Sequence, residues 1–565
     1  MSFGGKESPI KVMIIGAGFS GLAMACQLQR KLKCDDYVIY ERSSAPGGAW
    51  WANKYPGCAV DIPAVFYSLS FAPNPEFSKV FPSRAEILDY FNNVAERFNV
   101  PRHVIPNTEW EGAYWQDLTN TWLVKLKNLS TGDTFYQECN MLISAVGGLV
   151  NPNQFDVPGV DTFKGDIIHT ARWNDDISLC QKDVIVVGNG CSAAQLIPAI
   201  ADEPRSISQF IRTPQHYLEN DNMKVNDTWR FIFRHVPGAL WLSRMIVFIY
   251  LEGTAVRFNT GKNGVKARNE SADRSNEYIR QTAPAKCWSF LTPTYELGCK
   301  RRIFDNCKYI GCLQRSNIHL TDDPIVAVQS QSILTKSGQE HPADIILLAT
   351  GFSLTQYDVE VVGCNGRTRQ EHWGDFGYKE AYKSIAMSGF PNFFYVLGPN
   401  SGKGHTSTIY SIENYVDLII QVIAPVLKDH ASSVEVKSDR ERIYNEMLHE
   451  AITKTVFNNS CGSYFIDQKT QKNWFIYPWS SFTMWYSTHW SRADDWVYNV
   501  SAQAVKKKQR THSSFLPLAL MFGLVLFTYM TSQIMMETII GYHNNDHVID
   551  PDLHVMDDLR LKTDI

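Results

Sequence analysis

Apolar residues near the start of the chain change from the spacing of a strand to that of a helix and back. Lys11 to Ile15 is a short apolar run, and after a glycine-containing turn the apolar residues continue as a helix to Leu32. A second apolar run, Tyr37 to Tyr40, ends at Glu41. Short continuous runs of this kind are typical of buried parallel strands. The order of strand, glycine turn, helix, strand and acid predicts a nucleotide-binding βαβ unit.

The same pattern recurs further along the chain. Asp183 to Val187 predicts a strand, a second glycine turn opens a helix through Ile200, and Ile207 to Ile211 predicts the next strand. This strand ends at Arg212 and Thr213 instead of an acid. The chain therefore contains two nucleotide-binding units, which differ at the position that meets the ribose.

The two turns share the G-x-G-x-x-G/A spacing of dinucleotide-binding sites. Its positions are Gly16, Gly18 and Gly21 in the first turn and Gly188, Gly190 and Ala193 in the second. The three positions provide a tight turn, close approach of a pyrophosphate and close helix–strand packing, and the helix N-terminus binds the phosphates. Glu41 can accept hydrogen bonds from ribose hydroxyls, whereas Arg212 can pair with a 2′-phosphate. The sequence thus predicts NADPH on the second unit, delivering a hydride to a flavin, FAD, on the first.

Three alternating stretches between the units predict a small β-meander. They lead into a strand from Met141 to Ala145, and they are Glu111 to Tyr114, Thr121 to Lys127 and Thr134 to Gln137. A capping box at Ser83 and Glu86 predicts a helix that runs to about Phe98.

A long insertion follows the second unit, from about Asn220 to Lys300. Its apolar segment, Leu240 to Leu251, predicts a packed helix, because Ser243 and Arg244 make it too short and too polar to span a membrane. Asp344 to Ala349 predicts another strand, which returns the chain to the first domain. The first domain is therefore predicted to be discontinuous.

These elements predict an α/β fold of two Rossmann-like dinucleotide-binding domains, each with three layers around a parallel sheet. The β-meander, a helical insertion and one C-terminal transmembrane helix complete it. The predicted segments are the first part of an FAD-binding domain (1–160), a linker (161–182), an NADP-binding domain (183–340) with its insertion (about 220–300), the return of the FAD-binding domain (341–505), a transmembrane helix (515–536) and an acidic tail (537–565).

Composition narrows the classes of function. A chain of 565 residues with 44% hydrophobic and 20% charged residues is that of a globular protein of several domains. A formal net charge of -4 provides no basic face for nucleic acid, so that partner is excluded. No Cys/His group has the spacing of a zinc site, and no metal is predicted. The oligomeric state stays open.

The C-terminal region differs from the rest. Residues 515–536 contain no charge and are long enough to cross a bilayer as a helix. Lys506, Lys507, Lys508 and Arg510 precede this segment, and the tail after it is acidic. A basic flank stays on the cytosolic side, so we expect a single-pass membrane protein whose catalytic part is cytosolic. The endoplasmic reticulum is one candidate membrane, and a buried or interfacial helix is the alternative interpretation.

Two further motifs resemble those of a known family. The first is Phe163-x-Gly165-x-x-x-His169-x-x-x-Trp173, and the second is Gly47-Gly48-x-Trp50-x-x-x-x-Tyr55-Pro56-Gly57-x-x-x-Asp61. Together they resemble the class B flavoprotein monooxygenases, and within them the Baeyer–Villiger monooxygenases, from about residue 10 to residue 490. Pro or Asp usually follows the first motif in that family, whereas Asn174 stands here. The membrane segment is similar to fungal biosynthetic members.

The resemblance implies roles for single residues. Arg301, in the stretch Gly298-Cys-Lys300-Arg301, would stabilise the anionic C4a-peroxyflavin and the adduct that it forms with a carbonyl, and Asp61 would orient it. Lys300, with Arg212 and Thr213, would hold the 2′-phosphate of NADPH. The linker residues of the first motif would couple NADP binding to catalysis. The implied flavin site comprises Gly16, Gly18, Gly21, Glu41, Gly48, Trp50, Asp61 and Tyr67.

Plainer interpretations stay open for each assignment. Arg301 could be a surface charge, Asp61 could cap a turn, and His169 and Trp173 could be packing residues. The aromatic stretch from Trp474 to Trp496 could be core, pocket wall or membrane-interface belt, and core is favoured.

The resulting functional prediction is an FAD- and NADPH-dependent monooxygenase that inserts one oxygen atom of O2 into a lipophilic ketone, giving an ester or lactone, in secondary-metabolite biosynthesis. One alternative is a flavin monooxygenase that oxygenates nitrogen or sulfur, hydroxylates or epoxidises. A second is a membrane NADPH dehydrogenase, although the absence of a CxxC pair disfavours a disulfide reductase. A third is an inactive flavoprotein scaffold.

Overall fold

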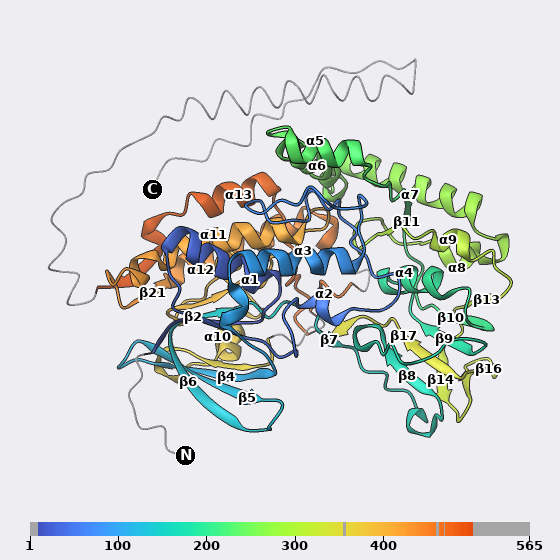
Figure 1. Ribbon diagram of the computed structural model, residues 1–565, viewed down its shortest axis with the longest axis horizontal. Coiled ribbons are helices and arrows are strands. Elements are labelled where there is room, and N and C mark those ends of the chain that lie inside the picture. Colours follow the sequence, from blue (N-terminus) through green and yellow to red (C-terminus); the bar gives the residue numbers. More distant parts are fainter. Residues whose placement is uncertain (1–8, 354–356, 459–462, 468, 501–565) are drawn as a thin grey trace. The chain divides into compact units, whose positions relative to one another are not determined.

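Figure 1 shows a computed structural model of the chain. The structure describes residues 9–353, 357–458, 463–467 and 469–500. The predicted transmembrane helix (515–536) and acidic tail (537–565) lie outside the described residues. A mixed sheet and a parallel sheet, each with its own helices, organise the described part of the chain.

The first sheet has the strand order β19-β4-β5-β6-β1-β2-β3, with β20 beside β6. Its strands are β1 (Ile10–Ile15), β2 (Tyr37–Tyr40), β3 (Val104–Ile105), β4 (Thr108–Gln116), β5 (Thr121–Asn128), β6 (Thr134–Ser144), β19 (Glu360–Val362) and β20 (Phe393–Tyr395). Strands β4, β5 and β6 form the predicted antiparallel meander. The last meander strand and the strand predicted after it are one strand, β6, whose second half pairs in parallel with β1.

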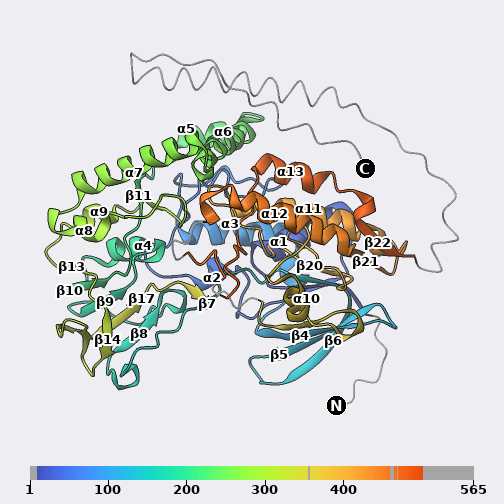
Figure 2. The same ribbon diagram turned by 180° about the vertical axis from the view of Figure 1, so that it is seen from behind.

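The two faces of this sheet are covered differently, as Figures 1 and 2 show. The helices on one face are α1 (Phe19–Gln27), α3 (Arg84–Arg97) and α11 (Thr408–Leu427), with α12 (Ser438–Thr453) and α13 (Ser481–His489) beyond them. Along β1, Val12 and Ile14 belong to the core under these helices. The alternating residues Met13 and Ile15 belong to a second core with the meander and α10 (Arg369–Phe376). A strand buried on both faces explains the continuous apolar run.

The second sheet is entirely parallel, with the order β13-β10-β9-β17-β8. Its strands are β8 (Asp166–His169), β9 (Asp183–Val187), β10 (Ser206–Phe210), β13 (Ile318–Thr321) and β17 (Ile345–Leu348). Helices α4 (Cys191–Ile200), α7 (Lys262–Thr282) and α9 (Tyr309–Cys312) contribute to the core on one face. The small sheet of β14 (Ile325–Val328), β15 (Ser332–Thr335) and β16 (Glu340–Pro342) covers the other.

Two segments predicted from the sequence belong to a different part of the fold from the one expected. The strand predicted at Asp344 to Ala349 forms β17, but β17 lies in the second sheet, and the chain returns to the first sheet only with β19 and β20. The first sheet is still discontinuous in sequence. The F-x-G-x-x-x-H-x-x-x-W segment, predicted as a linker, contributes β8 to the edge of the second sheet. Strand β17 pairs with β8 on one side and with β9 on the other, and an apolar run does not indicate which sheet it will join.

The insertion is helical, as predicted. It contains α5 (Asp227–His235), α6 (Ala239–Gly253), a 3-10 turn (Thr254–Phe258), α7 and α8 (Trp288–Leu291). The prediction that its apolar segment forms a packed helix holds for one face only, where Met245, Val247 and Ile249 pack against the core. Helix α6 buries only Phe248 and Leu251, because no layer of the described fold covers its other faces.

Candidate active site

The first glycine turn is closed by its own backbone. Gly16 has φ +104°, and a Cβ there would lie 2.6 Å from the carbonyl oxygen of Ala145. A Cβ at Gly21 would lie 2.1 Å from the Gly16 oxygen, so α1 packs directly on the turn. Side chains at either position would clash with backbone atoms that have no room to move. These contacts explain the first and third glycines of the motif.

The N-termini of α1 and α4 are both free of side-chain caps. Gly18 and Gly190 are their N-cap residues, and neither helix has an acidic residue in its first turn. In contrast, α3, α5, α10 and α13 are capped by Ser, Asn or Thr side chains. Uncapped N–H groups and the positive end of a helix bind phosphate. Each nucleotide unit thus presents a suitable pyrophosphate site.

Glu41 lies at the end of β2 and is buried. Its two carboxylate oxygens accept hydrogen bonds from the backbone nitrogens of Ala17 (2.7 Å) and Ser43 (2.8 Å). A carboxylate has about four lone-pair positions, so capacity remains for ribose hydroxyls. The structure therefore fixes Glu41 beside the glycine turn, where the sequence predicted it.

The second family motif connects the two nucleotide units. Gly48 faces the first turn, since a Cβ at Gly48 would lie 2.8 Å from the Cα of Gly18. Further on, Gly57 has φ +80°, and a Cβ there would lie 2.2 Å from the carbonyl oxygen of Gln195 in α4. The Tyr55 hydroxyl donates to Gln195 Oε1 at 2.7 Å. The motif thus holds the NADP-type helix against the flavin-type turn.

The second glycine turn is more open than the first. Gly188 has φ +118° and meets the Ala349 oxygen as Gly16 meets that of Ala145. A Cβ at Gly190, however, would meet no atom within 4 Å. The third position is Ala193, whose methyl group is fully buried.

Cations gather at the predicted 2′-phosphate site. Arg212 is exposed, and the Thr213 carbonyl accepts a hydrogen bond from Asn189 Nδ2 at 2.7 Å. Partial burial, together with the nearby charge of Arg212, lowers the pKa of Lys300. Among the described residues, neither Arg212 nor Lys300 forms an ion pair with a carboxylate. Two neighbouring cations without an acid suit a dianionic phosphate.

The residues of the first family motif have structural positions in the second sheet. A Cβ at Gly165 would lie 2.0 Å from the Asp344 oxygen, and Phe163 and Trp173 pack into cores. His169 Nδ1 accepts from the Ala171 nitrogen, so Nε2 carries the proton and donates to the Gly351 oxygen at 3.0 Å. Burial lowers the pKa of His169 and keeps it neutral. These four residues do not line the cavity described next; their coupling role stays a prediction.

Arg301 and Asp61 meet in a cavity of about 360 Å³ between the two units. Arg301 Nη2 lies 2.5 Å from Asp61 Oδ2. Burial raises the pKa of Asp61, but the charge of Arg301 and its hydrogen bond outweigh it, so the pKa lies below its ordinary value. The charge of Asp61 raises the pKa of Arg301 well above its usual range. The pair is therefore fully ionised at neutral pH.

Aromatic residues form the flavin-side wall of this cavity. Trp50 Nε1 donates to the Tyr67 hydroxyl at 3.2 Å, and the two rings pack edge to face. Burial raises the pKa of Tyr67 to about 12, so the hydroxyl stays protonated and can donate onward. Trp50, Asp61, Tyr67, Lys300 and Arg301 all line the cavity, and their assignment to the flavin and NADP sites stays a prediction.

The segment Leu397 to Ser411 also lines the cavity, and its site residues were not predicted. Helix α11 begins there without a side-chain cap or an acid in its first turn. The buried hydroxyls of Thr406 and Ser411 line the cavity and have no hydrogen-bond partner within the described part of the chain. Buried hydroxyls without partners are costly, so they indicate a bound polar group. The Gly-Pro-Asn-Ser-Gly run before α11 was the available signal.

These features fit FAD and NADPH. The uncapped α1 and the fixed Glu41 suit the ADP part of FAD, and the uncapped α11 with its free hydroxyls suits a polar flavin edge. The uncapped α4 and the cations beside it suit NADPH. Two such units around one ionised cavity define a flavoprotein oxidoreductase that uses two dinucleotides.

Comparisons with known proteins identify the family. Residues 14–82 match the family NAD(P)-binding Rossmann-like domain. The chain is 32% identical to the FAD-binding monooxygenase ktnD of Aspergillus niger, over 89% of this chain and 84% of that protein. It is 31% identical to a Baeyer–Villiger monooxygenase of Pseudomonas aeruginosa, over 83% and 87%. The chain belongs to the FAD-binding monooxygenases of the Baeyer–Villiger type and is an NADPH-dependent enzyme of that kind.

Solved structures confirm the fold. Cyclohexanone monooxygenase from Rhodococcus sp. Phi1 bound to NADP+ is similar with a TM-score of 0.77 and 24% identity, over 87% of this chain and 100% of that chain. A steroid monooxygenase bound to NADP is similar with a TM-score of 0.74 and 24% identity, over the same shares.

Proposed function

We propose that this enzyme oxidises a lipophilic ketone to an ester or lactone. In this reaction ketone, O2, NADPH and a proton give the ester, NADP+ and water. Bound FAD supplies the electron transfer from NADPH to O2. The relatives that carry the Baeyer–Villiger name, and the pair formed by Arg301 and Asp61, support this proposal. A role in secondary-metabolite biosynthesis is inferred from the resemblance to fungal members.

Arg301 is the residue on which the proposal depends most. Its cation lies in the cavity and Asp61 fixes it from one side, leaving other N–H groups free for the reacting oxygen atoms. A fixed cation stabilises negative charge as it develops, without reorganising during the reaction.

Substitution of Arg301 tests this role. We expect Arg301→Ala to retain FAD and its reduction by NADPH, while ketone oxidation falls at least about 100-fold and hydrogen peroxide forms instead. Arg315→Ala is the matched control, because Arg315 forms an exposed ion pair with Asp202 and does not line the cavity. Loss of FAD in Arg301→Ala would assign a structural role, and full activity would remove Arg301 from catalysis.

A substrate panel separates ketone oxidation from the other oxygenations. Lipophilic ketones, small water-soluble ketones, amines and thioethers would be compared by the product formed per NADPH. Ester formation from lipophilic ketones is the expected result. Preferential N- or S-oxide formation would favour the heteroatom alternative, and good turnover of only small soluble ketones would contradict a lipophilic substrate.

We also propose that residues 515–536 anchor the enzyme in a membrane, with the catalytic part in the cytosol. Their lack of charge and the basic residues before them support this. The full-length chain should remain with membranes after alkaline carbonate extraction. Leu524→Arg/Leu526→Arg should release it, whereas Leu524→Val/Leu526→Val should not, and release of the unmodified chain would contradict the anchor.

A further inference from the structure

Helix α6 is unusual because it is apolar but uncovered. Within the segment Ala239–Phe258, an 18-residue stretch has a mean hydropathy of 1.4, and only 11% of that stretch is buried. Leu242, Ile246 and Tyr250 follow one another at intervals of four residues and form a single exposed stripe, with Tyr250 71% exposed. An exposed apolar stripe of this length on a folded body marks an interaction surface.

Helix α13 continues this stripe. Phe482, Tyr486 and Trp490 also follow one another at intervals of four residues, and Tyr486 is 63% exposed. Phe482 packs against Phe248 of α6, with ring centroids 4.9 Å apart, so the two helices adjoin. Figures 1 and 2 both show α6 and α13 on the same side of the protein. The aromatic stretch favoured as core is therefore split, because Trp474 and Trp496 are buried whereas these side chains are exposed.

Helix α5 extends the surface further. It contacts α6, contains no buried residue, and exposes Trp229 and Phe231. Together, the exposed side chains of α5, α6 and α13 form one surface, the docking face. Within the described residues, the indole N–H groups of Trp229, Trp241 and Trp490 donate no hydrogen bond to the protein. The polar tips of these rings thus have no partner in the described part of the chain, whereas Trp229 packs against Phe233 and Trp490 against Tyr486, both on the same helices.

Aromatic type points to lipid as the occupant, and the sequence near the docking face is poor in acids. Residues 481–490 contain no Asp or Glu, and residues 224–258 contain five Lys or Arg and two Asp or Glu, of which Arg234 is paired with Glu76 and Arg244 is buried beside Glu413. Exposed Trp and Tyr favour the headgroup level of a bilayer, where the ring is in hydrocarbon and its polar tip is in water. We propose that the docking face lies in the interfacial layer of a lipid bilayer.

The length of the chain beyond the structure agrees with this occupant. Only residues 501–514 separate the described body from the uncharged segment 515–536. Fully extended, they reach at most about 50 Å. If that segment anchors the enzyme, as proposed above, this tether keeps the catalytic body close to the same membrane.

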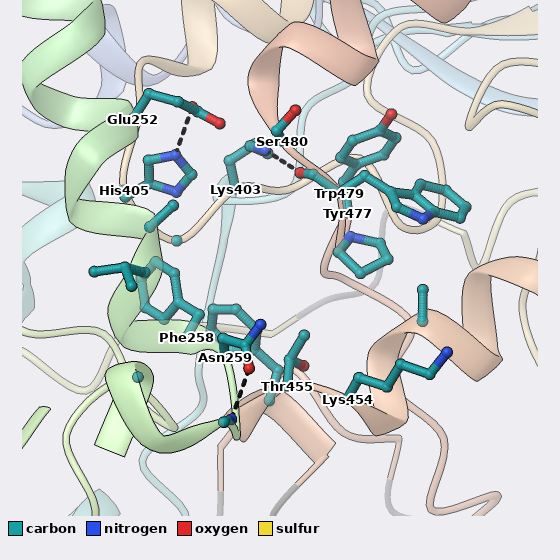
Figure 3. A pocket seen from close by; sticks show the side chains of 18 of the residues that line it. Glu252, Phe258, Asn259, Lys403, His405, Lys454, Thr455, Tyr477, Trp479 and Ser480 are labelled. Carbon is teal, nitrogen blue, oxygen red and sulfur yellow. Dashed lines mark hydrogen bonds and ion pairs between the residues drawn. The ribbon is translucent and has the colours of Figure 1, made fainter. Parts of the chain in front are cut away.

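A pocket lies beside the docking face and adjoins the active-site cavity. Figure 3 shows a pocket of about 840 Å³ whose walls include Glu252 at the end of α6 and Ser480 at the start of α13. It shares Phe258, Lys403 and His405 with the active-site cavity. This pocket therefore adjoins the active-site cavity across these three side chains, on the side of the protein that carries the docking face.

The polar groups of this pocket are held in place. Glu252 accepts from His405 Nε2 at 2.9 Å and from the Ser481 nitrogen at 2.7 Å. Burial raises the pKa of Glu252, but its bond to His405 and the charge of Lys403 outweigh it and lower that pKa to about 2. The carboxylate thus ties α6 to the start of α13 at neutral pH, which keeps the two stripes of the docking face together.

Vesicle sedimentation of the full chain tests the proposal. The background is Leu524→Arg/Leu526→Arg, which silences the predicted anchor, and the probe is a phosphatidylcholine vesicle containing phosphatidylserine. We expect this protein to bind, and Trp241→Ser/Tyr250→Ser/Tyr486→Ser to weaken binding by about tenfold or more. The matched control is Leu118→Ser/Tyr136→Ser, because these side chains are 100% and 55% exposed on the meander. The control should bind normally.

Four outcomes would overturn the proposal. The background protein does not bind vesicles, or the face and control variants bind equally. In the third, the protein forms a dimer and does not bind vesicles, and the face variant is monomeric. This result would assign the face to a second copy of the chain. If only deletion of residues 506–565 exposes vesicle binding, that segment covers the face instead, and the proposal also fails.

Steady-state kinetics tests the lipid contact separately from the proposed ketone oxidation. The face variant should raise KM for a ketone supplied in vesicles by about tenfold and leave kcat/KM for a water-soluble ketone unchanged. An equal loss for both ketones would mean that the variant damages the fold. If the unmodified enzyme oxidises no ketone, the proposed function fails while the sedimentation result still decides the docking face.

Discussion

In the first nucleotide unit the chain itself fills the space around the glycine turn, whereas in the second unit that space is open. Gly48 faces Gly18, and α1 touches the turn so closely that Gly21 has no room for a Cβ. In the second unit a Cβ at Gly190 meets nothing, and Ala193 carries its methyl group without strain. Two units of the same topology therefore differ in how firmly they can enclose a nucleotide.

The charged residues of the two units also differ, with the first unit again the more enclosed. The acid of the first unit, Glu41, is buried and doubly hydrogen-bonded, whereas Arg212 of the second is exposed. A closed cradle suits a cofactor that stays bound, and an open cationic site suits one that arrives and leaves in each turnover. The difference corresponds to FAD as a resident group and NADPH as a co-substrate.

The largest expected effect comes from exchanging the third motif residue between the units. Gly21→Ala places a methyl group against the Gly16 oxygen, so we expect most FAD to be lost and the fold to be destabilised by about 3 kcal/mol. Ala193→Gly should retain FAD and cost about 1 kcal/mol. Flavin absorbance per protein and thermal unfolding would measure both. Equal FAD loss in the two variants would remove the difference between the units.

The cations of the second unit are expected to have a specific effect on NADPH. Arg212→Ala and Lys300→Ala should each raise KM for NADPH by about tenfold and KM for NADH by less than about twofold. Steady-state rates with the two nucleotides would be compared with those of Arg315→Ala. Equal effects on NADPH and NADH would contradict a 2′-phosphate site.

The open second turn predicts a smaller, purely local effect. Gly190→Ala should leave folding and FAD content unchanged, because its methyl group meets no protein atom. It should raise KM for NADPH by about fivefold, since the methyl group occupies the approach of the pyrophosphate. A fall in thermal stability would show that this turn is as closed as the first.

The smallest effect concerns pH at the junction of the units. The pKa of Asp61 lies below its ordinary value, so its ionised form stabilises the fold above about pH 4, and this contribution is lost as pH falls through the lowered pKa. Asp61→Asn should therefore lower Tm at pH 7 and have less effect as the pH approaches the acid range. A constant difference in Tm at all pH values would contradict the ion pair.

The sequence predicted the strand–turn–helix units well because their signals are local. The glycine spacing, the acid at Glu41 and the basic end at Arg212 each lie within one βαβ unit. The meeting of Arg301 with Asp61 came from the family resemblance, since the two residues are 240 positions apart. No local pattern could have placed them together.

Other features depended on packing that the sequence does not encode locally. The apolar run of β17 could have joined either sheet, and the structure puts it in the second. The most apolar 18-residue stretches of the α6 segment and of α11 have similar mean hydropathies, 1.4 and 1.2. However, 11% of the α6 stretch is buried and 67% of the α11 stretch is buried. Thr406 and Ser411 became candidates only when the structure showed their buried hydroxyls without partners.

The most direct test of the account is oxygen-isotope labelling. The full-length enzyme would be supplied with NADPH, ¹⁸O2 and a lipophilic ketone, and the product would be examined by mass spectrometry. The account predicts an ester or lactone with one ¹⁸O atom for each NADPH consumed, the other ¹⁸O atom leaving as water. NADPH consumption that yields labelled hydrogen peroxide, with no labelled product from any ketone, would contradict it.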